Sequence, residues 1–293
     1  MTIDSKHLLD RSFAPIAHAY TKRDTQLYAL GLGFGHDPLD ERALRYVYEG
    51  VGGDQLRTVP TMVNVLAYPG FWAREPDTGI NWQKLVHAEQ EIRIHAPLPV
   101  EGQVVSHNKV SALWDRGAGK GAFMQQQREV LGADGKLLAA VTQLTLLRGD
   151  GGFSETSPGS AGAPPAPHLI PERAPDAVCE LPTLPQAALI YRLSGDYNPL
   201  HADPAVAKTA GFERPILHGM ATMGVAAHAV LRELLDYDPS RFAGMRVRFT
   251  APVLPGDTLR TELWRDGTVV SLRTTAVERG AVVLNNGRVD LAA

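Results

Sequence analysis

The sequence predicts an α+β protein made of two tandem halves, each an antiparallel sheet wrapped around one helix. Three observations support this prediction. The same order of elements appears before and after a central segment, a helix-like segment precedes runs of strand-like residues, and turn signals separate those runs. With 293 residues, 44% of them hydrophobic and 21% charged, the chain can bury two packed halves.

The internal repeat is visible in two pairs of prolines. The segments "IRIHAPLPVEGQV" and "VRFTAPVLPGDTL" each predict a strand, an Ala-Pro step, a turn and a second strand, which makes Pro97 equivalent to Pro252. The same offset pairs Pro60, in "TVPTMVNVLAY", with Pro215, in "RPILHGMATMGVAAHAVLREL". Two matches at one offset indicate an internal duplication.

The segment 148–176 is the most Pro/Gly/Ser-rich part of the chain and predicts a linker between the halves. We therefore expect an N-terminal half at 1–148, a linker at 149–176 and a C-terminal half at 177–293. Strands are expected at 102–114, 121–132 and 137–147 in the first half, and at 245–253, 258–267, 268–280 and 281–291 in the second. The turn signals are "ADGK", "RDGT" and "NNGR".

The two expected helices differ. The C-terminal one, from about Gly219 to Leu235, is apolar almost all round, which is typical of a buried helix. The N-terminal one starts after Pro60 and meets Pro69 and Gly70, which should end it early. The shortened helix predicts either an ordinary surface loop or room for a bulky acyl group inside the sheet.

Composition excludes several classes of protein. The net charge is -3, and no polybasic run predicts binding to nucleic acid or to a membrane surface. The single cysteine, Cys179, excludes an intramolecular disulfide and a Cys-rich metal site. The N-terminal residues lack the apolar core of a signal peptide, no segment approaches the ~18 apolar residues of a membrane span, and "VDLAA" is no peroxisomal address. We expect a cytoplasmic protein.

The segment "YRLSGDYNPLHADP", at 191–204, predicts an irregular loop, because glycine, proline, aspartate and asparagine all favour turns. On this loop Asp196 and His201 could serve as two proton carriers acting on one substrate. The structural alternative is that Asp196 and Asn198 form Asx turns while His201 and Asp203 cap the following helix. The residues of the loop leave both interpretations open.

Gly219, in "LHGMATMG", is expected at the start of the buried helix. Its backbone N–H would then be a free donor at the positive end of the helix dipole, where a negative oxygen could develop. Glycine at this position also lets a ligand approach closely.

The loop and the following "AGFERPILHG" closely resemble the signature of the hydratase 2 (MaoC-like) family of (R)-specific enoyl-CoA hydratases. The resemblance covers nearly the whole chain, including "YTKRDTQLYALGLGFG", "KLVHAEQEI" and "RFTAPVLPGDTLRTELW". It implies a double hotdog fold, in which each half wraps its sheet around a central helix.

The resemblance also implies roles for individual residues. Asp196 and His201 would hold and activate water, Asn198 would hold the loop or the water, and the Gly219 amide would bind the thioester oxygen. The implied substrate contacts are His87, Ala88, Arg116, Tyr197, Pro199, Leu200 and Phe249. Ala88 replaces the glycine usual in the family. Arg116 could meet a CoA phosphate or be a solvated turn residue.

The implied reaction is reversible hydration of a trans-2-enoyl-CoA to the (3R)-3-hydroxyacyl-CoA, without a metal or redox cofactor. The N-terminal half lacks the Asp-x-Asn-Pro-x-His order and would bind the acyl tail. The expected partner is the acyl-CoA substrate, and a homodimer is plausible. The alternatives are a hotdog acyl-CoA thioesterase, a dehydratase of carrier-protein-bound 3-hydroxyacyl groups, and a non-catalytic acyl-CoA-binding subunit.

Overall fold

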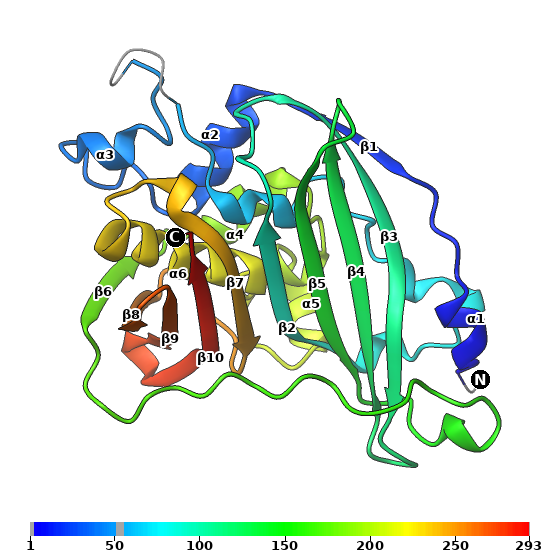
Figure 1. Cartoon of the computed structure of the whole chain (residues 1–293). Coiled ribbons are helices and arrows are strands. Elements are labelled where there is room, and N and C mark those ends of the chain that lie inside the picture. The colour runs from blue at the N-terminus through cyan, green and yellow to red at the C-terminus, as the bar shows by residue number, and fades with distance from the viewer. Residues whose placement is uncertain (1–2, 51–55, 293) are drawn as a thin grey trace.

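The computed structural model describes residues 3–50 and 56–292, and the strands in these ranges form one antiparallel sheet (Figure 1). The strands are β1 (Ile16–Tyr20), β2 (Leu85–Ile94), β3 (Gly102–Asp115), β4 (Ala122–Gly132), β5 (Leu137–Leu147), β6 (Ala177–Pro182), β7 (Phe242–Phe249), β8 (Thr258–Asp266), β9 (Val269–Ala276) and β10 (Ala281–Leu291). Their order across the sheet is β1-β3-β4-β5-β2-β7-β10-β9-β8-β6.

Both halves of the sheet have the same strand order. From the outer edge to the centre, the first half runs β1-β3-β4-β5-β2 and the second runs β6-β8-β9-β10-β7. Pro97 lies just beyond the end of β2 at Ile94, and Pro252 lies just beyond the end of β7 at Phe249. The predicted internal duplication and the equivalence of these two prolines are therefore confirmed.

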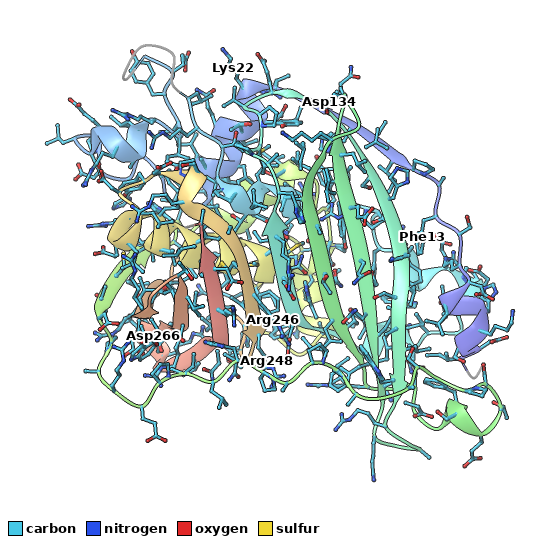
Figure 2. The ribbon with its side chains drawn as sticks, in the orientation of Figure 1. Phe13, Lys22, Asp134, Arg246, Arg248 and Asp266 are labelled. Atoms are coloured by element: carbon cyan, nitrogen blue, oxygen red, sulfur yellow. The ribbon has the colours of Figure 1, made fainter. Side chains whose placement is uncertain are left out.

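The halves join where β2 pairs with β7, with Gln90 opposite Val247 and Ile92 opposite Met245. Glu89 of β2 is buried at 5% exposure and accepts hydrogen bonds from two guanidinium groups of β7, each with an Nε at 2.9 Å. These groups belong to Arg246 and Arg248, which lie near one another along β7 in Figure 2. One buried carboxylate thus holds two charged partners across the junction.

The helices of the described ranges are short except for one long buried helix. They are α1 (Ser5–Leu9), α2 (Lys22–Gly31), α3 (Glu41–Leu44), α4 (Ala187–Tyr191), α5 (Pro204–Thr209) and α6 (Gly219–Leu234). The predicted buried C-terminal helix is confirmed as α6, whose residues from Met220 to Leu231 are all buried. None of these helices has the length and apolar character needed to cross a membrane.

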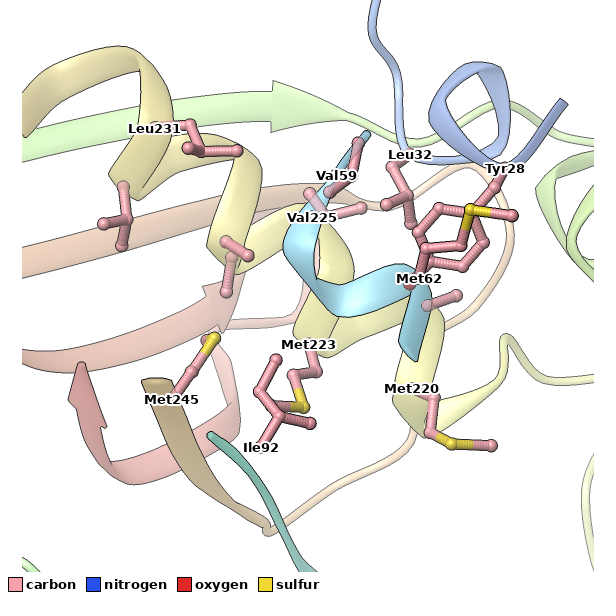
Figure 3. Packing of buried hydrophobic residues seen from close by; sticks show 14 of the residues in the cluster. Tyr28, Leu32, Val59, Met62, Ile92, Met220, Met223, Val225, Leu231 and Met245 are labelled. Carbon is pink, nitrogen blue, oxygen red and sulfur yellow. The ribbon is translucent and has the colours of Figure 1, made fainter. Parts of the chain in front are cut away.

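The N-terminal counterpart of α6 is a five-residue 3-10 helix, η1 (Pro60–Asn64), which packs along α6 in Figure 3. This helix ends five residues before Pro69, so Pro69 is not the residue that ends it, contrary to the expectation. The Arg128 guanidinium, from β4, donates to the carbonyl oxygens of Asn64 at 2.8 Å, of Val63 at 3.2 Å and of Leu66. A continued helix would need these acceptors for its own N–H groups.

Three details differ from the sequence-based expectation. The edge strands β1 and β6 precede the helical segments and were not predicted, because five or six residues carry too little periodicity. "NNGR" is a bulge within β10 rather than a turn, and Asn286 has a φ of 52° there. The expected linker runs along one edge of the molecule and is anchored, with Phe153 buried and His168 bonded to Ser271 at 2.7 Å (Figure 1).

Candidate active site

The loop between α4 and α5 is built from local turns, as its composition predicts. Asp196 Oδ1 accepts a hydrogen bond from the Asn198 backbone N–H at 3.2 Å, and Asn198 Oδ1 accepts one from Leu200 at 3.1 Å. Asp203 caps α5 by accepting from the backbone N–H of Ala205 at 2.8 Å. The Asx-turn and capping interpretations are thus confirmed for the aspartates and Asn198. Among the described residues, the turn uses only the Oδ1 atom of the Asp196 carboxylate.

The expectation that His201 caps α5 together with Asp203 is wrong, because Asp203 alone is the N-cap. The Nδ1–H of His201 donates to the backbone carbonyl of Ile216 at 2.8 Å, because a carbonyl can only accept. This bond makes Nε2 the unprotonated nitrogen. Burial lowers the pKa of His201, which is 9% exposed, so its imidazole is neutral at pH 7. A neutral ring with an open Nε2 lone pair can accept a proton.

His218 is a functional candidate that sequence reasoning missed. Its ring stacks on that of His201, with centroids 3.7 Å apart, and its Nε2–H donates to the backbone carbonyl of Asp196 at 3.1 Å. Its Nδ1 is buried without a partner among the described residues. Burial, together with His201, lowers the pKa of His218 to about 3. The feature of the sequence that could have pointed to His218 is its position directly before Gly219.

Gly219 begins α6, so its N–H has no acceptor within the helix. A Cβ at this position would lie 3.1 Å from the Phe249 ring, so the glycine leaves space between the helix start and the end of β7. The Phe249 ring contacts that of His87, with centroids 4.8 Å apart. The helix terminus, β7 and β2 therefore converge on one point.

His87 is held neutral beside a bulge in β2. Its Nε2–H donates to Gln90 Oε1 at 2.9 Å, and burial lowers its pKa to about 4. Ala88 is the extra residue of the bulge, since the pairing with β5 shifts between His87 and Glu89. Ala88 has no positive φ, so alanine is tolerated where the family usually has glycine.

A narrow pocket, with about 30 Å³ of space for water-sized molecules, lies beside the short helix η1. Its lining includes Met220, in the first turn of α6 directly after Gly219, and Tyr68, which follows η1. Burial and the nearby charge of Asp196 raise the pKa of Tyr68 to about 12. The early end of the N-terminal helix thus coincides with a pocket that reaches the start of α6 at Met220.

The other expected substrate contacts lie on the loop itself and in the turn between β3 and β4. Tyr197 is 58% exposed, and the Arg192 guanidinium lies 4.9 Å from its ring centroid. Pro199 and Leu200 form the short turn that carries His201. Arg116 lies in the turn between β3 and β4, with its guanidinium 5.3 Å from the Phe123 ring centroid, and no described contact joins it to the loop. Their roles in substrate binding stay predictions.

One group of side chains in the described ranges brings together potential metal ligands. A carboxylate oxygen of Asp196 and ring nitrogens of His201 and His218 lie within 4.8 Å of one another. A metal ion binds an imidazole in the plane of the ring at about 2.0–2.1 Å. The two rings are stacked with only 29° between their planes, which does not direct both lone pairs at one ion. The group suits proton transfer better than metal binding.

Comparisons with known proteins match both halves. Residues 18–149 match the family model of the MFE-2 hydratase 2 N-terminal domain, and residues 168–286 match that of the MaoC like domain. Peroxisomal enoyl-CoA hydratase 2 from Arabidopsis thaliana is 38% identical, with 98% of this chain and 95% of the relative covered. The chain belongs to the MaoC-like hydratase 2 family.

Two solved structures share the fold. A MaoC-like dehydratase from Phytophthora capsici superimposes with a TM-score of 0.86, 33% identity and 99% coverage of both chains. Rv0216 from Mycobacterium tuberculosis, described as a double hotdog, superimposes with a TM-score of 0.57 and 20% identity over 96% of this chain and 94% of that one. The expected family and the double hotdog fold are both confirmed for this hydratase 2 chain.

Proposed function

We propose that this chain hydrates trans-2-enoyl-CoA thioesters to (3R)-3-hydroxyacyl-CoA and catalyses the reverse dehydration. The observation that carries the proposal is the placement of three groups. The open Nε2 of neutral His201 and the carboxylate of Asp196 lie on one loop, and the free Gly219 N–H lies directly after His218, which stacks on His201. His201 would act as the base, the Asp196 carboxylate would bind the water, and the Gly219 N–H would donate a hydrogen bond to the developing oxyanion.

The reaction needs one water molecule and moves two protons. His201 Nε2 accepts a proton from a water that Asp196 also binds, while the water oxygen bonds to the β-carbon. The electrons of the double bond move toward the thioester carbonyl, whose oxygen becomes negative and accepts a hydrogen bond from the Gly219 N–H. A proton returned by the catalytic pair then bonds to the α-carbon, so the net change is the addition of H and OH.

Other parts of the proposal concern the setting of the reaction. The thioester stabilises the developing anion by itself, so the proposal includes no metal or redox cofactor. The N-terminal half binds the acyl tail in the pocket beside η1. Cytoplasmic location and a homodimer are also part of the proposal. The single cysteine, which is buried and unpaired, agrees with a protein of a reducing compartment.

Loss of the enoyl-thioester absorbance tests the function directly. With crotonyl-CoA and trans-2-decenoyl-CoA as substrates, we expect the band to disappear and chiral analysis to find the (3R) product. Faster turnover of the longer substrate would agree with the pocket beside η1. Release of free CoA without loss of the double bond would instead identify a thioesterase and contradict the proposal.

Two variants of Gly219 distinguish the effect of losing its N–H from the effect of adding a side chain. Gly219→Pro removes the donor, and proline is tolerated at the first position of a helix when the preceding residue is extended, as His218 is with ψ 135°. We expect kcat about 10²-fold below that of Gly219→Ala, which keeps the N–H.

Gly219→Ala is the matched control because alanine and proline both place a Cβ toward Phe249, 3.1 Å from its ring. Circular dichroism should show that both variants fold. Equal kcat values for the two variants would remove the Gly219 amide from the mechanism.

A further inference from the structure

Three glutamines form a row across neighbouring strands of the N-terminal half. Gln90 of β2 pairs with Gln143 of β5, which pairs in turn with Gln126 of β4. Directly opposed residues of antiparallel strands point to the same face of a sheet. All three side chains line the pocket beside η1, so we call this set the glutamine row.

The glutamine row begins at the thioester end of the site and leads away from it. Gln90 accepts from His87 at 2.9 Å and donates to Asn64 Oδ1 at 2.9 Å, so both of its polar atoms are used. Gln126 lies two strand spacings farther, about 10 Å from β2. The outer members of the row therefore face the distal part of an acyl group whose thioester lies at Gly219.

The two outer glutamines each keep one polar atom open. Gln143 donates its amide to Thr145 Oγ1 at 3.1 Å, which leaves its carbonyl oxygen free. Gln126 accepts from the Trp72 indole N–H at 3.4 Å, which leaves its amide N–H₂ free. Within the described ranges no other group bonds to these two atoms. The pocket thus presents an acceptor and a donor on adjacent strands.

A saturated acyl tail would cover these two atoms and exclude water from them, but it could offer them no hydrogen bond. Each polar group left unsatisfied in this way costs about 1–3 kcal/mol. A hydroxyl group can donate to Gln143 and accept from Gln126, whereas a keto group can only accept. The remaining lining is also mixed, because Asn108 and Arg128 accompany the aromatic ring of Trp72.

We propose that the preferred substrates are enoyl thioesters with an oxygen substituent, above all a hydroxyl, on the distal part of the acyl group. The glutamine row recognises that oxygen. This inference rests on the proposed hydratase function and names the class of acyl group for the same site. A reaction that hydroxylates or retains oxygen on an acyl chain must supply the substrate.

The test compares kcat/KM for trans-2-decenoyl-CoA with that for its derivatives hydroxylated at carbon 8, 9 or 10. We expect the wild-type protein to prefer at least one hydroxylated substrate by about tenfold, the effect of one good hydrogen-bonded group. In a Gln126→Met/Gln143→Met variant the preference should be lost or reversed. Methionine has nearly the volume of glutamine, so the shape of the pocket is kept.

Gln125→Met is the matched control. Gln125 is the neighbour of Gln126 on β4 and points to the other face, where its amide donates to Ser111 at 2.9 Å. The selectivity ratio of this variant should equal that of the wild type. A ratio that falls as far as in the double variant would show that the effect is structural and would overturn the inference.

Crotonyl-CoA separates the two proposals, because its four-carbon acyl group is too short to reach the outer glutamines. Hydration of crotonyl-CoA with equal kcat/KM for the plain and all hydroxylated C10 substrates would overturn the inference and leave the hydratase function standing. No hydration of any substrate would contradict the function itself. The wild-type comparison needs no variant, so it decides the matter even if the double variant does not fold.

Discussion

Replacing His201 with alanine is expected to lower kcat for enoyl-CoA hydration by about 10³–10⁴-fold. The substitution removes the open Nε2 that takes the proton from water, together with the ring that donates to the Ile216 carbonyl. Asp196→Ala should have an effect of similar size. Steady-state kinetics with crotonyl-CoA measure both losses.

The double variant should be only slightly slower than either single variant, because groups that act as one unit lose their effect together. Asp203→Ala is the matched control, since this aspartate is in the same loop and only caps α5. It should lower stability by about 1 kcal/mol and leave kcat near the wild-type value. Near-normal turnover in both His201→Ala and Asp196→Ala would refute the assignment of the catalytic pair.

Arg128→Met is expected to destabilise the fold by about 3–5 kcal/mol. Arg128 is 6% exposed, and its guanidinium binds the carbonyl oxygens of Val63, Asn64 and Leu66 at the end of η1. Burial lowers its pKa to about 10, so it keeps its charge at neutral pH. Methionine fills similar volume and leaves three carbonyls without a donor. Urea unfolding measures the difference in free energy.

Arg93→Met provides the comparison, because Arg93 forms an exposed ion pair with Glu91 at 2.8 Å. Exposed pairs of this kind contribute at most about 1 kcal/mol, so the midpoint of unfolding should hardly move. Arg128→Lys should recover part of the loss, since an ammonium offers donors without the planar fork of arginine. An unfolding midpoint for Arg128→Met equal to that of Arg93→Met would show that the carbonyls find other partners.

Much of the secondary structure could be read from short stretches of sequence. The expected strand at 137–147 has the bounds of β5, and the apolar segment from Gly219 is α6 to within one residue. Asp203 followed by Pro204 marks the start of α5, because the cap and the first helical position are set by neighbouring residues. The loop with Asp196 and His201 could be recognised for the same reason, since its turns are local.

The arrangement of these elements depended on contacts between distant residues. The sheet continues through the β2–β7 pairing, and η1 ends because Arg128 reaches it from β4. The stacking of His218 on His201 and the glutamine row likewise join residues from separate elements. Local propensity and turn chemistry act over a few residues, so the sequence alone determined most of the elements and the turns of the loop that carries Asp196 and His201. Strand pairing and burial decided which side chains share the pocket, and only the tertiary structure shows them.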